Sequence, residues 1–116
     1  MLALLTEKYK ASGISETIKL YHTLKAENYY NNYFYNENTL LNPAYELLNN
    51  NLVEDALQLF ILNAEEYRFA PNAFDSLAEA YLKKGDREQA ISNYKKALSI
   101  DPNFESSKKA LAELVK

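Results

Sequence analysis

The chain has 116 residues, of which 47% are hydrophobic and 25% are charged, and its formal net charge is −3. This composition is that of a single globular domain and excludes a disordered chain. The negative charge disfavours a nucleic-acid partner, because nucleic-acid-binding surfaces are usually basic. The absence of cysteine excludes disulfides and thiolate metal sites, and only two glycines and three prolines are present for tight turns or phosphate loops. We therefore expect an all-α protein.

The N-terminal residues predict neither secretion nor membrane insertion. The apolar run Met1–Leu5 is too short for a signal peptide, and Glu7 and Lys8 follow it closely. No uninterrupted apolar stretch of about 18 residues, the length that a membrane-spanning helix needs, occurs in the chain. The sequence thus predicts a soluble protein with no membrane partner, and it leaves the cellular compartment unknown.

The first third of the chain predicts a helical hairpin followed by an insertion. One helix covers Leu2–Ala11, Gly13 ends it, and a second helix follows with Thr17 and Tyr21 on its apolar side. Residues 28–36 then form a polar loop that is rich in aromatic residues. Its aromatic side chains either fold back to seal the first hairpin, which is the preferred interpretation, or form a partner surface. They are Tyr29, Tyr30, Tyr33, Phe34 and Tyr35.

A second hairpin is predicted in the middle of the chain. Its first helix runs from about Leu40 to Asn49, and Pro43 falls in the first turn, where a missing amide removes no intrahelical hydrogen bond. Asn49, Asn50 and Asn51 form the turn, because asparagine is the commonest residue after glycine in the left-handed conformation of helix ends. The second helix covers Val53–Tyr67. Its apolar stripe consists of Ala56, Leu57, Phe60 and Ala64.

The third hairpin carries the clearest pattern, with helices over Asn72–Lys84 and Arg87–Ile100. Gly85 supplies a left-handed turn between them, and Pro102 ends the second helix because the residue before a proline leaves the helical conformation. Small residues let the helix backbones approach closely, while aromatic residues fill the space around them. The stripe residues are Phe74, Leu77, Ala78 and Tyr81 in the first helix, and Ala90, Ile91, Tyr94, Ala97 and Leu98 in the second.

A period of 34 residues relates the second and third hairpins. It separates Ala56 from Ala90, and Phe60 from Tyr94. The corresponding distance from Thr17 to Ala56 is 39 residues, which indicates an insertion of five. We divide the single domain 1–116 into a degenerate first repeat with the insertion (1–36), two repeats (37–70 and 71–104) and a capping helix (103–116) that is apolar on one face only.

The third hairpin resembles a tetratricopeptide repeat (TPR), a helix–turn–helix unit of about 34 residues. The resemblance lies in the spacing Phe74-x-x-Leu77-Ala78-x-x-Tyr81 and Ala90-x-x-x-Tyr94-x-x-Ala97, followed by Pro102. It implies an all-α, right-handed solenoid of antiparallel helix pairs, an α-α superhelix of about seven helices. It also implies a non-catalytic protein–protein interaction scaffold that binds a peptide or a partner domain through its concave face.

A narrower resemblance concerns the C-terminal TPR segment of many bacterial serine hydrolases, which are β-lactamase-like enzymes or esterases. It lies in Phe60-x-Leu62-Asn63-x-Glu65-x-Tyr67 and in the run Asn72–Tyr81. Two positions depart from that pattern: Arg68 stands where proline is usual, and Pro43-Ala44-Tyr45 replaces a Leu-Gly-Tyr run. The alternative function implied here is a structural appendage of a hydrolase whose catalytic domain is absent from this chain.

The candidate binding residues lie on the first helices of the second and third repeats, which line the concave groove in TPR proteins. Asp75 and Glu79 make this groove acidic, which disfavours the acidic C-terminal tails of chaperones. The preferred interpretation of this pair by itself is a solvated helix face without function, and nothing in the sequence predicts a raised pKa for either carboxyl. A basic or amide-rich peptide, an apolar element, or an upstream domain of the same full-length chain fits better. The predicted groove residues are Asn38, Leu41, Asn42, Tyr45, Leu48, Asn72, Asp75, Ser76, Glu79 and Lys83.

The sequence predicts no catalytic residue, no cofactor and no metal site. Ser92 and Lys95 have the Ser-x-x-Lys spacing of a known nucleophile motif, but they lie in a packed repeat helix and the accompanying motifs are missing. The chain also has no Gly-x-Ser-x-Gly motif and no glycine-rich phosphate loop. His22, the single histidine, has no second ligand at a metal-binding spacing, so we expect it at the surface. We expect a protein that is not an enzyme, and a monomer.

Overall fold

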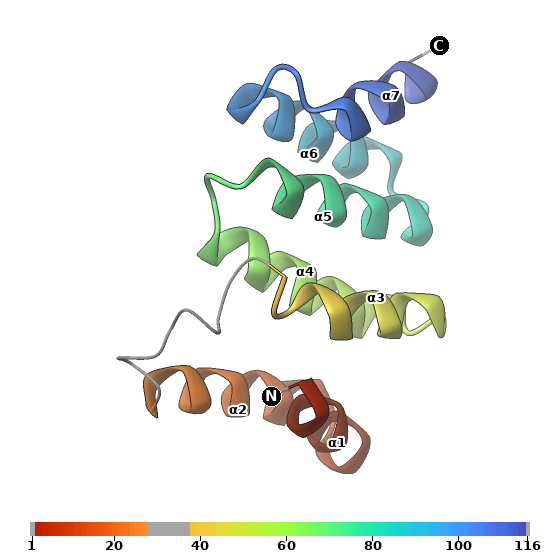
Figure 1. The fold of residues 1–116 in the computed structure, drawn as a ribbon. Coiled ribbons are helices and arrows are strands. Elements are labelled where there is room, and N and C mark those ends of the chain that lie inside the picture. The colour runs from red at the N-terminus through yellow and green to blue at the C-terminus, as the bar shows by residue number, and fades with distance from the viewer. Residues whose placement is uncertain (1, 28–37, 116) are drawn as a thin grey trace.

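Three helical hairpins and a final single helix are stacked along one direction of the molecule (Figure 1). The computed structural model describes residues 2–27 and 38–115. These two ranges form seven α-helices and no strand, which confirms the predicted all-α helical-repeat fold. The helices are α1 (Leu2–Ser12), α2 (Ile14–Glu27), α3 (Leu41–Asn49), α4 (Val53–Glu66), α5 (Pro71–Lys84), α6 (Arg87–Ile100) and α7 (Glu105–Leu114).

Two helices end with the same hydrogen-bonding motif, one period apart in the sequence. Asn51 after α3 and Gly85 after α5 have φ angles of 64° and 92°, in the left-handed region. Glycine adopts this conformation freely and asparagine tolerates it, so the predictions for both turns are confirmed. In each turn two backbone N–H groups donate to carbonyls of the last helical turn, which is the Schellman motif. The bonds are Asn51 to Leu48 (3.1 Å), Leu52 to Leu47 (2.9 Å), Gly85 to Leu82 (3.0 Å) and Asp86 to Tyr81 (2.9 Å).

The helix starts also follow from the local sequence. α3 begins at Leu41, which places Pro43 in its first turn, and α5 begins at Pro71 itself. Proline is tolerated there because the first amides of a helix have no intrahelical partner. α6 begins after Asp86, whose carboxylate accepts a hydrogen bond of 3.1 Å from the backbone N–H of Gln89. The predicted bounds of these two hairpins agree with α3 to α6 to within one residue.

The predicted apolar stripes of the second and third hairpins form the core. Phe60 and Tyr94, which the period relates, are both buried. The small side chains lie where helix backbones meet, and Ala78, Ala90 and Ala97 are fully buried. At the C-terminal end, α7 covers this core. Its Ala110, Leu111 and Leu114 pack against Ala78, Ala90 and Tyr94.

The first hairpin joins the stack differently from the others. α4 packs closely on α5, and α6 packs on α7, but within residues 2–27 and 38–115 α2 makes no comparable contact with α3. Instead, α1 touches α3 and α2 touches α4. Two polar contacts fix this arrangement: the Tyr9 hydroxyl donates to Asp55 Oδ2 (2.6 Å), and Lys25 Nζ donates to Glu66 Oε2 (2.6 Å). The different docking is consistent with the longer spacing before the second repeat.

The predicted aromatic insertion at residues 28–36 lies outside the described residues. Both interpretations of Tyr29, Tyr30, Tyr33, Phe34 and Tyr35 therefore stay predictions. Within the described ranges, no helix is long and apolar enough to cross a membrane.

Candidate functional site

The predicted groove residues lie on α3, just before α3, and on α5, and these two helices are in contact in the stack. Their side chains divide into two sets by exposure. The accessible set, which we call the candidate binding face, contains Asn38, Asn42, Tyr45, Asn72, Glu79 and Lys83. The buried set contains Leu41, Leu48, Asp75 and Ser76.

The apolar part of the predicted groove is corrected by the structure. Leu41 and Leu48 belong to the hydrophobic core, so no apolar element of a partner can settle on them. The physical reason is that α3 packs on both α4 and α5, which together cover the leucine side of this short helix. Of the residues that were expected to contact an apolar element of a partner, only Tyr45 stays partly accessible.

The expected solvated pair of carboxylates is also corrected, because Asp75 is buried while Glu79 is exposed. The side chain of Asp75 is only 3% exposed. Its Oδ1 accepts a hydrogen bond from Ser107 Oγ (2.7 Å) and its Oδ2 accepts one from Ser106 Oγ (2.9 Å). Both serines lie on α7, which covers this side of α5. Asp75 therefore links two helices and does not face a ligand.

Tyr45 occupies the centre of the candidate binding face and connects it to the core. Its hydroxyl donates to Ser76 Oγ (2.8 Å) and is also within hydrogen-bond distance of Glu79 Oε1 (3.2 Å). Its ring meets the buried ring of Phe60 edge-on, with the ring centroids 5.0 Å apart. These contacts hold the aromatic ring and the carboxylate of Glu79 in fixed positions next to each other.

The polar links between successive first helices have the same register. Tyr45 on α3 bonds to Ser76 on α5, and Asp75 on α5 bonds to Ser106 on α7, and both pairs are 31 residues apart. Equivalent residues of neighbouring repeats are 34 positions apart in the sequence, whereas these hydrogen-bonded residues are 31 positions apart. A residue on one first helix therefore bonds to a residue of the next first helix that lies three positions, close to one helical turn, before its own equivalent. The stack is thus tied together along one side by equivalent hydrogen bonds.

The surroundings of Glu79 favour a positively charged neighbour. Partial withdrawal from water raises the pKa of its carboxyl, and the negative charge of Asp75 raises it further, against the lowering effect of the Tyr45 hydroxyl. Within the described residues Glu79 takes part in no ion pair. A cationic group beside it would therefore stabilise its charged form.

One comparison with known proteins identifies the repeat. Residues 76–104 match the family model of the tetratricopeptide repeat. This part of the chain is therefore similar to a tetratricopeptide repeat. The matched segment runs from Ser76, within α5, through the Gly85 turn and α6 to Phe104, so it covers most of the hairpin with the clearest sequence pattern. A search of curated proteins gave no match. TPR repeats generally mediate protein–protein interactions and are typically non-catalytic.

The role of the two serines that bind Asp75 was not predicted from the sequence, which leads us to expect a last helix that is polar on its outer side. Ser107 is fully buried. The sequence carries one signal for this position, because Ser107 lies three residues after Phe104 and four before Leu111, on the apolar stripe of α7. A serine within an apolar stripe indicates a buried hydrogen bond to a polar partner.

The stability of the helical stack is expected to fall between pH 10 and about 12. Burial raises the pKa of Tyr45 to about 12, and the hydrogen bond to Asp55 raises the pKa of Tyr9 to about 12, both from 10.0. Because the folded-state values exceed the unfolded one, this stabilisation is complete below pH 10 and is lost as the pH rises toward 12. Urea unfolding at a series of pH values, together with tyrosinate absorbance, measures the loss. Tyr45→Phe removes one titrating hydroxyl and should flatten the slope; an identical slope in this variant would contradict the assignment.

The other residues that the sequence singles out lie outside the candidate binding face. His22 is exposed on α2, and its ring meets that of Tyr21 edge-on. Ser92 and Lys95 are exposed on α6. Among the described residues, no cluster of three or more histidine, cysteine or acidic side chains could hold a metal ion.

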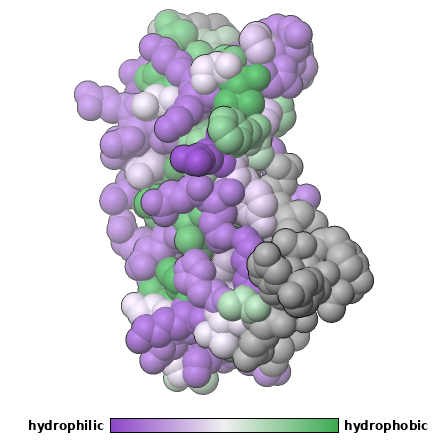
Figure 2. Space-filling model, turned by 90° about the vertical axis from the view of Figure 1, so that its left-hand side faces the viewer, coloured by the Kyte–Doolittle hydropathy of each residue, from purple (hydrophilic) through white to green (hydrophobic). Residues whose placement is uncertain are grey.

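The surface of the helical stack carries scattered hydrophobic residues. On the face drawn in Figure 2, hydrophilic residues predominate and hydrophobic areas are small and separate. The exposed large hydrophobic residues come from different elements, and Phe69, which is 83% exposed, is the most accessible of those described. Polar and amide side chains, more than an apolar patch, therefore determine what this surface can bind.

Proposed function

We propose that this chain is a non-catalytic scaffold that binds an extended peptide of a partner protein on the candidate binding face. The observation that carries this proposal is the presence of accessible amide side chains on the same two helices as the hydrogen-bonded Tyr45–Glu79 pair. Asn42 on α3 is exposed and Asn72 on α5 is half-exposed. A carboxamide group both donates and accepts hydrogen bonds, so it can pair with the backbone of an extended peptide whatever its sequence.

The charges of the face support a basic or amide-rich peptide. The negative charge of Asp75 is buried under α7, so Glu79 is the acidic group that a ligand meets, and Lys83 lies one turn further along α5. A lysine or arginine of the peptide beside Glu79 would offset the partial desolvation that raises its pKa. An acidic peptide tail would be repelled at the same position.

Fluorescence anisotropy with three pools of labelled random-sequence peptides, basic, neutral and acidic, tests this function. We expect the basic pool to bind most tightly and the acidic pool most weakly. The double variant Asn42→Ala/Asn72→Ala should weaken binding about 30-fold, because each of the two lost hydrogen bonds contributes about 1 kcal/mol. Gln58→Ala, which removes an exposed amide from α4, is the matched control and should leave affinity unchanged. Equal affinities for the three pools would refute the assignment. An equal loss of affinity in the Asn42→Ala/Asn72→Ala variant and in the Gln58→Ala variant would refute it as well.

The second candidate function is a structural appendage of a serine hydrolase, in which the bound partner is an upstream domain of the same full-length chain. What supports it is the run from Phe60 to Tyr81 described above. The genomic reading frame upstream of Met1 tests it. A long coding stretch with a Ser-x-x-Lys or Gly-x-Ser-x-Gly motif would favour this function, and an in-frame stop codon directly upstream would eliminate it.

A further inference from the structure

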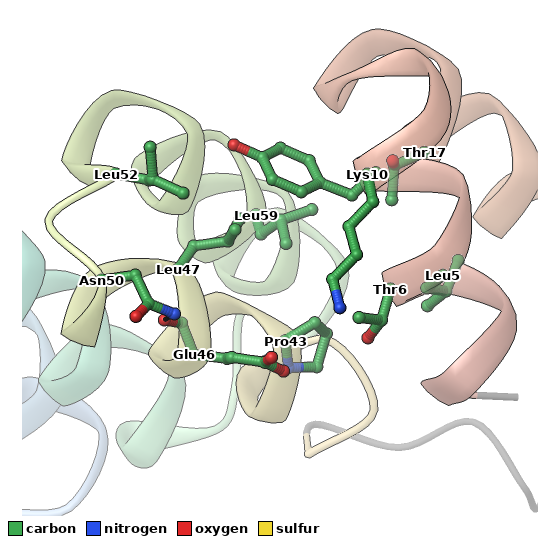
Figure 3. A pocket seen from close by; sticks show the side chains of 11 residues that line it. Leu5, Thr6, Lys10, Thr17, Pro43, Glu46, Leu47, Asn50, Leu52 and Leu59 are labelled. Atoms are coloured by element: carbon green, nitrogen blue, oxygen red, sulfur yellow. Dashed lines mark hydrogen bonds between the residues drawn. The ribbon is translucent and has the colours of Figure 1, made fainter.

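A pocket of about 190 Å³ lies where the first hairpin meets the second, between α1 and the C-terminal end of α3 (Figure 3). Its walls are mainly apolar, and they come from four helices and the turn before α4. Leu5 and Tyr9 of α1 line it, together with Leu47, Leu52 and Leu59 from the second hairpin. The pocket shares no residue with the candidate binding face, so its properties do not depend on peptide binding.

The unusual docking of the first hairpin accounts for this pocket. Later in the chain, the second helix of each hairpin packs directly on the following helix and fills the space between repeats. At the first junction, α2 has no comparable contact with α3 within the described ranges, so space stays open beside Leu47 and Leu59. The 2.6 Å hydrogen bond from Tyr9 to Asp55 holds the tyrosine ring in place as a wall. The pocket is therefore formed before any ligand arrives, as ligand sites usually are.

The mouth of the pocket carries opposite charges. Lys10 from α1 and Glu46 from α3 both extend toward the side occupied by Pro43 (Figure 3). Neither takes part in an ion pair with another described residue. A ligand with a net charge would be attracted by one of these groups and repelled by the other, while a molecule of zero net charge meets no such conflict.

The size and the lining then define the ligand. An apolar cavity of about 150 Å³ is large enough to hold a benzene molecule, so this pocket has room for one substituted ring or two small fused rings. We propose that the pocket between α1 and α3 binds a compact apolar molecule of zero net charge, such as a small aromatic compound. Its apolar body lies against Leu5, Leu47 and Leu59, and any polar substituent points to the mouth between Lys10 and Glu46.

NMR titration of the full chain with indole, benzoate and benzylamine tests the proposal, because the three probes are similar in size and differ in charge. We expect indole to shift the methyl signals of Leu5, Leu47 and Leu59, with a dissociation constant on the order of 1 mM, as is typical of such small ligands. Benzoate and benzylamine should each bind at least about threefold more weakly, because each meets one like charge at the mouth. Absence of shifts at these methyl groups with indole would overturn the proposal.

Two variants separate specific binding from general hydrophobic contact. Leu52→Trp, at a partly exposed position of the pocket wall, should fill the space and weaken indole binding about tenfold or more. Leu82→Trp is the matched control, since Leu82 is similarly exposed and lies outside the pocket, and it should leave binding unchanged. Lys10→Glu, at an exposed position, should strengthen benzylamine binding relative to benzoate. Unchanged indole affinity in Leu52→Trp, or an unchanged order of the charged probes in Lys10→Glu, would overturn the assignment.

Discussion

Asp75→Lys is expected to lower the free energy of unfolding by about 3–5 kcal/mol, because it places an uncompensated charge in a buried site. In the native protein the carboxylate is 3% exposed and accepts hydrogen bonds from Ser106 and Ser107 of α7. The lysine would leave both hydroxyls without their acceptor and would force α7 away from α5. Urea denaturation followed by circular dichroism measures the change. Since small domains are stabilised by only about 5–15 kcal/mol, α7 or the whole stack should be partly unfolded in this variant.

Two further substitutions show whether burial causes this loss. Asp75→Asn keeps the shape and an acceptor oxygen for one serine, so it should cost only about 1 kcal/mol. Glu79→Lys makes the same charge reversal one turn later on the exposed side of α5, and it should change stability by no more than about 0.5 kcal/mol. If Asp75→Lys and Glu79→Lys were equally stable, Asp75 would have to be solvated, as the sequence alone predicts.

Phe60→Ala is expected to cost about 3–5 kcal/mol, the range for removal of a buried aromatic side chain. Phe60 is fully buried in α4, and its ring supports Tyr45 at a centroid distance of 5.0 Å. The alanine leaves a cavity in the core and also frees the tyrosine at the centre of the candidate binding face. The same denaturation experiment gives the cost, and peptide binding by the variant should also weaken.

Phe69→Ala is the matched control for this prediction. Phe69 is 83% exposed in the segment between α4 and α5, so its removal should change stability by no more than about 0.5 kcal/mol. Comparable losses in Phe60→Ala and Phe69→Ala would contradict the burial that the structure shows for Phe60.

The sequence by itself determined the repeat and its helices, because these depend on signals that are local in the chain. Phe60 and Tyr94 fall on stripes of helical spacing, and both are buried. Asn51 and Gly85 are residues that accept a left-handed backbone, and both end a helix in the same way. Each of these features is set by residues within one or two helical turns, so one hairpin carries enough information to predict it.

The tertiary structure alone decided which polar residues stay exposed. Asp75 and Glu79 lie on neighbouring turns of one helix, and only the position of α7 buries the first and leaves the second exposed. Likewise, the docking of α1 against α3 forms a pocket that no local pattern predicts. The physical reason is that the exposed side of a helix depends on how the neighbouring helices, about 31 residues away in the sequence, are aligned against it. The sequence period shows which residues of two repeats are equivalent, but it does not show which residues of the two repeats are in contact.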